Sequence, residues 1–162
     1  MATFTVDTKA LNKIQDKFKQ TAELYKAYAI QEVDKAVKAM QVEAAAKAGN
    51  LPRLNTTPKY PYRRTGNLSK SISSTPYQNG YATFSMGNES VKYAPYVEFG
   101  TGKGFGIPPY KFSTKKPLKN LASEFRGSKL RDYNMQNRPF FFNTFDEKFA
   151  ILLKTLKSYK VK

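Results

Sequence analysis

Residues 8–48 contain neither glycine nor proline, and the first glycine after them is Gly49. This uninterrupted segment constrains the fold more than any other feature of the sequence. Apolar or alanine side chains recur along it at steps of three and four residues, the spacing that keeps one stripe on one side of an α-helix. The stripe consists of Leu11, Ile14, Phe18, Ala22, Tyr25, Ala29, Val33, Ala36, Met40 and Ala44. An unbroken helix of this length would run about 60 Å, more than the width of a domain of this size. We therefore expect the helix either to bend or to extend far enough to touch a neighbour.

A β-hairpin is predicted in the middle of the chain. Two segments suited to strands, 72–77 and 81–86, flank Asn79-Gly80, a dipeptide typical of tight hairpin turns. Pro76 lies inside the first segment, and proline is tolerated in a strand only at an edge or an irregularity. We therefore expect an edge strand or a local irregularity there.

The last helix is predicted from another apolar stripe, which is formed by Phe145, Phe149, Leu152, Leu153 and Leu156. Thr144 and Glu147 have the spacing of a capping box, which satisfies exposed N–H groups at a helix start. The aromatic run over 140–142 precedes them. Because aromatic rings bury a large area, we interpret this run as core that packs the last helix against the sheet and the long helix. A partner-facing anchor is the alternative, since aromatic residues dominate interface hot spots.

The fold class expected from these signals is α+β. A long N-terminal helix and a C-terminal helix pack on a small antiparallel β-sheet, and the whole chain, 1–162, forms one domain. Its parts are the long helix over 8–48, the hairpin and sheet region over 65–101, an extended basic arm over 102–137 and the C-terminal helix over 139–157. Within the arm, residues 117–125 have the spacing of a short helix with one apolar face.

Charge is the most unusual part of the composition. Lys and Arg number 28 against 12 Asp and Glu, a net charge of +16. The arm alone holds eight Lys or Arg residues and two acidic ones. Such an excess favours an acidic partner, either nucleic acid through its phosphates or an acidic protein surface, although a merely solvated basic loop has the same composition.

The residues that the chain lacks argue against enzymatic chemistry. It has no Cys and no His, which excludes a thiol nucleophile, a Ser-His-Asp triad and the usual zinc sites. The glycine-rich segment 100–106 fails the phosphate-loop pattern because Gly104, not Ser or Thr, follows Lys103. We therefore predict that the chain is not an enzyme and needs no cofactor or metal. No apolar stretch approaches the ~18–20 residues that span a bilayer, and no signal peptide is visible, so we expect no membrane association.

Glu98 is a lone acid among apolar residues in the segment 93–101. A catalytic carboxylate normally works with a second acid or a metal, and no such partner lies near it in the sequence. A structural role is therefore favoured, in which the carboxylate either pairs with an arginine or caps backbone N–H groups. Arg138 is the candidate arginine.

Three segments together resemble a known family. They are Arg64-Thr65-Gly66-Asn67-Leu68-Ser69-Lys70-Ser71-Ile72, Tyr93-Ala94-Pro95-Tyr96-Val97-Glu98-Phe99-Gly100-Thr101 and Arg138-Pro139-Phe140-Phe141. In this order, between a long helix and an amphipathic one, they resemble the head–tail joining (neck or tail-completion) proteins of long-tailed bacteriophages. The resemblance spans roughly residues 8–158, and the middle segment is its most specific part. The chain departs from the family over 102–137, where a shorter link is expected.

The resemblance implies a structural virion protein. Identical subunits, commonly six, would form a homo-oligomeric ring in the neck, between the head connector or adaptor proteins and the tail tube or tail terminator protein. DNA would pass through the central channel. Assembly would take place in the host cytoplasm. A tail terminator or another tail component is the nearest alternative within phage particles. Outside them, the alternative is a basic nucleic-acid-binding protein that acts by non-specific phosphate contacts.

Candidate docking residues share either a place in the family's segments or a charge in the loops and the arm. They are Arg63, Arg64, Tyr96, Glu98, Phe99, Lys103, Lys111, Lys115, Lys116, Lys119, Arg126, Lys129, Arg131 and Arg138. We expect the basic ones to meet acidic surfaces of neighbouring proteins, or the passing DNA.

Overall fold

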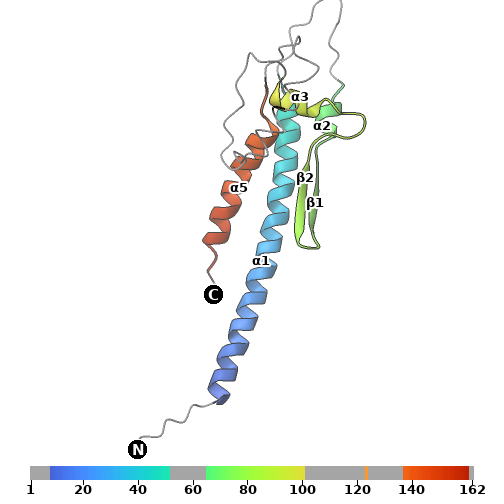
Figure 1. The fold of residues 1–162 in the computed structure, drawn as a ribbon. Helices are drawn as coiled ribbons and strands as arrows, with labels where there is room; N and C mark the ends of the chain where they lie inside the picture. The colour runs from blue at the N-terminus through green and yellow to red at the C-terminus, as the bar shows by residue number, and fades with distance from the viewer. Residues whose placement is uncertain (1–7, 52–64, 101–122, 124–136, 161–162) are drawn as a thin grey trace, which may run out of the picture.

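The computed structural model describes residues 8–51, 65–100, 123 and 137–160, and it has the α+β architecture that the sequence predicts. In chain order the elements are α1 (Thr8–Gly49), α2 (Asn67–Lys70), β1 (Ser73–Gln78), β2 (Tyr81–Ser85), α3 (Ala94–Phe99) and α5 (Phe141–Lys157). The two strands form an antiparallel sheet. Figure 1 shows the hairpin on one side of α1 and α5 on the other, with α2 and α3 at the C-terminal end of α1.

Helix α1 runs unbroken over 42 residues, which is about 63 Å at 1.5 Å per residue. Its C-terminal half carries the core, where Val37, Met40, Ala44 and Ala48 are buried. Its N-terminal half projects past the other described elements (Figure 1), and every side chain over 12–20 is exposed. The helix therefore extends beyond the other described elements, while the contact with a neighbour that its length leads us to expect stays a prediction.

The hairpin turn forms at Asn79-Gly80, as predicted. Both residues have positive φ, 52° and 94°, which is what a type I′ turn requires. The register of the strand pair shifts between Thr75 and Gln78. Pro76 lies in this interval and has no N–H to donate to the partner strand. The strands begin and end within one residue of their predicted bounds, and the predicted irregularity is confirmed.

Polar side chains of α1 hold the hairpin in place. Asp34 accepts the backbone N–H of Tyr77 through Oδ1 at 2.5 Å. Gln41 uses both ends of its amide, because Nε2 donates to the carbonyl of Ile72 at 3.3 Å and Oε1 accepts the hydroxyl of Ser74 at 2.9 Å. These directional bonds fix where the strands lie along the helix, which apolar contact alone would leave adjustable.

The core lies where the end of α1 meets the hairpin and the start of α5. Ala44 and Ala48 are buried there with Phe140 and Phe141. The short alanine side chains leave room for the aromatic rings to approach α1 closely. Phe84 of β2 stacks on Phe141 with ring centroids 4.0 Å apart. The interpretation of the aromatic run as core is confirmed.

The start of α5 differs from the prediction. The helix begins at Phe141, inside the predicted range 139–157, and Thr144 already lies within it. The Thr144 hydroxyl donates to the carbonyl of Phe140, one turn earlier, at 2.6 Å. It therefore bonds a carbonyl of the same helix end and does not cap an N–H group. The predicted capping box of Thr144 and Glu147 is therefore wrong. The N–H groups at this end have an acceptor from another part of the chain, described next.

Candidate functional site

The three segments that resemble the phage family meet at the C-terminal end of α1, where Figure 1 shows α2 and α3. In the first segment, the Ser69 hydroxyl donates to the carbonyl of Ala45 in α1 at 2.9 Å. In the third, the backbone N–H of Arg138 donates to the carbonyl of Val97, in the second, at 2.9 Å. Segments far apart in the sequence thus build one junction.

Glu98 lies at the centre of this junction, with an exposed fraction of 0%. Its Oε2 accepts the backbone N–H groups of Phe140 and Phe141 at 2.9 and 3.0 Å, and its Oε1 accepts that of Phe142 at 3.1 Å. The first N–H groups of a helix have no partner within the helix, and they carry its positive dipole end. The carboxylate supplies both the acceptors and the opposite charge. Of the two structural roles left open for Glu98, the capping of backbone N–H groups is confirmed.

Burial corrects the prediction that Glu98 and Phe99 contact a partner. Phe99 is 2% exposed, and its ring stacks on Phe142 with centroids 5.6 Å apart. Helix α3 turns both side chains toward the start of α5, so in the described chain neither reaches the surface. Tyr96 and Arg138 are half-buried and keep some surface, so they remain docking candidates.

The other predicted docking residues lie outside the described residues. They are Arg63, Arg64, Lys103, Lys111, Lys115, Lys116, Lys119, Arg126, Lys129 and Arg131. The same holds for the predicted short helix over 117–125, of which the structure describes only Ser123, as helical. It holds also for the rest of the arm over 102–137, apart from Asn137 at its end. The docking role of the arm therefore stays a prediction.

A charge cluster links α1 to α5 beside the core. Glu43 accepts from Lys148 at 2.5 Å and from Lys47 at 2.8 Å, and Lys47 also reaches Glu147 at 2.9 Å. The hydrogen bonds from Lys148 and then Lys47 lower the pKa of Glu43 from 4.5 to about 2. The Glu43–Lys47 pair has the four-residue spacing of a helical ion pair and could be found in the sequence. The partners on α5 could not, because only the fold brings them near.

Stability should depend on the ionisation of Glu43. Its pKa is lower in the folded chain than its ordinary 4.5, so the stabilisation is complete above about pH 4.5 and is lost as the pH falls toward 2. Glu43→Gln should lower the free energy of unfolding at pH 7 by about 1 kcal/mol, because partial exposure screens the cluster. Urea unfolding at several pH values measures this, with Glu23→Gln on the exposed half of α1 as control. A Glu43→Gln effect that stays equal at pH 7 and pH 2 would contradict the cluster's role.

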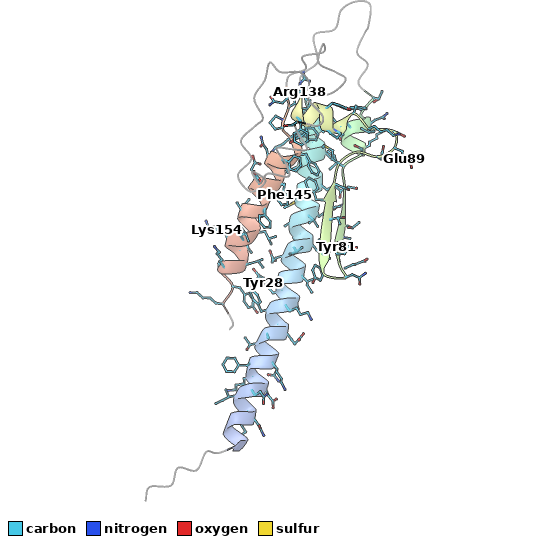
Figure 2. The ribbon with its side chains drawn as sticks, in the orientation of Figure 1. Tyr28, Tyr81, Glu89, Arg138, Phe145 and Lys154 are labelled. Atoms are coloured by element: carbon cyan, nitrogen blue, oxygen red, sulfur yellow. The ribbon has the colours of Figure 1, made fainter. Side chains whose placement is uncertain are left out.

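An apolar groove opens on α1 between β2 and α5, with a volume of about 580 Å³. Its lining includes Val33, Met40, Ala82, Phe84, Phe145 and Phe149. Figure 2 shows Phe145 in the space between α5 and α1. The sequence predicts the two helical stripes that supply Val33, Met40, Phe145 and Phe149, but it does not reveal the groove, because that depends on how far α5 and the hairpin stand apart.

A second apolar surface lies on the projecting half of α1, and we call it the N-terminal stripe: Ile14, Phe18 and Tyr25. These side chains are 51%, 72% and 41% exposed. The segment after α5 reaches only the C-terminal end of this stripe. There the ring of Tyr159 lies against those of Tyr28 and Tyr25, at centroid distances of 4.4 and 5.3 Å. Figure 2 shows that neither the hairpin nor α5 lies beside the side chains nearer the start of the helix.

Comparisons of the chain with protein families, with curated proteins and with solved structures find no match. Among the residues that the structure describes, no three His, Cys, Asp or Glu side chains gather as a metal site. No helix in the same described ranges has the length and apolar character to cross a membrane. Within the described residues, the junction around Glu98 and the two apolar surfaces are the features on which a functional proposal can draw.

Proposed function

We propose that this chain is a structural subunit of the neck of a long-tailed bacteriophage. Its subunits form a ring, of six copies, that joins the head connector to the tail and leaves a channel for DNA. The observation that carries the proposal is that the three family-like segments share one apolar cluster, through Ile72, Val97 and Phe140, and that Glu98 and the N–H of Arg138 tie the second segment to the third. The residues that carry the resemblance are therefore also residues that build this end of the fold.

The shape of the chain also supports an assembling subunit. The first half of α1 projects into solvent and exposes large apolar side chains, which adds little to the stability of a single chain. Exposed apolar patches of this kind mark interaction sites. A ring needs two different surfaces on each subunit, so that the contact repeats around the axis until it closes. The groove and the N-terminal stripe are two such surfaces.

The position of the chain in a particle tests this proposal. Purified particles of the phage that encodes the chain would be labelled with an antibody against it and imaged by electron microscopy. We expect the label at the head–tail junction of each particle. Label along the tail would favour a tail component instead, and particles without label would contradict any place in the virion.

The net charge of +16 supports a second candidate function, a free nucleic-acid-binding protein that contacts phosphates without sequence preference. This protein would shift unrelated DNA duplexes as a free species at physiological salt, and the logarithm of its affinity would fall linearly with the logarithm of the salt concentration. Strong binding of this kind by a chain that is absent from particles would replace the neck proposal.

A further inference from the structure

The N-terminal stripe and the apolar groove of the same molecule cannot contact each other. The groove lies over the C-terminal half of α1, between Val33 and Met40, whereas the N-terminal stripe lies on the other half of the same helix. No glycine or proline interrupts α1 before its last residue, Gly49, and Figure 1 shows the helix leading away from the hairpin and α5. Folding the stripe back into its own groove would require breaking the helix. Only another copy can bring this stripe to the groove.

The stripe is long enough to fill the groove and shares its apolar character. Ile14 and Tyr25 lie 11 residues apart, which is about 17 Å along a helix. The groove's lining spans the same 11 residues on α5, from Phe141 to Leu152, and a shorter stretch on α1, from Val33 to Met40. Phe18, the most exposed residue of the stripe at 72%, lies between its two ends. An apolar helix face laid in an apolar groove is a common mode of protein recognition.

We propose that the N-terminal stripe of one copy docks in the apolar groove of the next copy. The proposal builds on the ring proposed above and names its subunit contact. The contact is heterologous, because helix and groove are different surfaces, so each copy gives its stripe to one neighbour and receives a stripe from the other. Each subunit thereby covers both of its open apolar surfaces.

Two other occupants are possible in principle, and the test separates them. Two stripes could pair with each other, which would make a symmetric dimer and leave the groove open. The chain's own segment 117–125, predicted as a short helix with an apolar face, could fill the groove from within the same molecule. Neither arrangement covers the stripe and the groove of every copy together, which favours the contact between neighbours.

Chemical crosslinking tests the contact directly, because the native chain has no Cys that could react. Ala22→Cys places a thiol beside the N-terminal stripe, and Ala82→Cys places one in the groove. The two single variants are mixed, one of them isotope-labelled, and treated with a bis-maleimide. We expect a covalent dimer that contains one chain of each variant. Ala27→Cys is the matched control, an exposed alanine five residues on and about 140° around the helix, and it should give little product with Ala82→Cys.

Three crosslinking results would overturn the proposal. The first is the same yield from Ala27→Cys as from Ala22→Cys. The second is a product made of two Ala22→Cys chains, which assigns the stripe to a symmetric pair. The third is an internal crosslink in the double variant Leu121→Cys, Ala82→Cys, which assigns the groove to the segment 117–125.

The oligomeric state gives an independent readout. Phe18→Glu should weaken self-association by at least about 100-fold, because the contact would bury an unpaired charge. Its helix content should stay unchanged, since Phe18 is exposed in the monomer. Gln20→Glu adds the same charge on the opposite face and should leave association intact. If the native chain stays monomeric at every concentration in light scattering, the contact is wrong, whereas the neck proposal still stands if labelling finds the chain at the head–tail junction.

Discussion

Replacing Glu98 with alanine should lower the free energy of unfolding by at least about 3 kcal/mol, because three backbone N–H groups at the start of α5, two of them buried, would lose the carboxylate that accepts them. The negative charge at the positive end of the helix would be lost as well. Glu98→Gln should cost less, about 2 kcal/mol, since one amide oxygen still accepts but the NH₂ group faces donors. Urea unfolding followed by circular dichroism measures both changes.

The control for this prediction is Glu89→Ala, which removes an exposed carboxylate from the loop before α3. We expect its effect to lie within about 0.5 kcal/mol of zero, as for most surface substitutions. Hydrogen exchange adds a local readout, because the amides of Phe140, Phe141 and Phe142 should lose protection in Glu98→Gln before the rest of α5 does. Equal losses from the Glu98 and Glu89 variants would show that the cap adds nothing to stability.

The elements predicted well are those with local signals. The absence of glycine and proline together with a three-and-four spacing predicts α1, and Asn79-Gly80 predicts the hairpin, because in both cases the information lies within one short stretch of chain. The cap of α5 was predicted wrongly for the opposite reason. The cap comes from Glu98, 42 residues before Phe140, and no local spacing indicates which distant carboxylate will reach a helix end.

The candidate site, too, was predictable only where its features have local signals in the sequence. The sequence predicts that an apolar stripe runs the whole length of α1, but it does not predict that α5, with 17 residues, is long enough to cover only part of it. It marks Glu98 as a structural carboxylate, but it does not reveal that Glu98 and Phe99 are both buried. Which residues of a motif are buried and which remain on the surface depends on packing between distant segments, and that is what the structure adds.

Phe141→Ala should lower the free energy of unfolding by about 3–5 kcal/mol, the usual cost of removing a buried phenylalanine. The ring is 8% exposed, stacks on Phe84 at 4.0 Å and meets Phe142 edge-on at 5.4 Å, so its loss leaves a cavity among rings from two elements. Phe145→Ala is the matched control on the same helix. Phe145 is half-buried and faces the groove, and we expect its loss to cost about half as much. Unfolding measured on dilute protein checks both variants. Equal costs would contradict the difference in packing between the two rings, because Phe145 would then be as fully packed as Phe141 within a single chain.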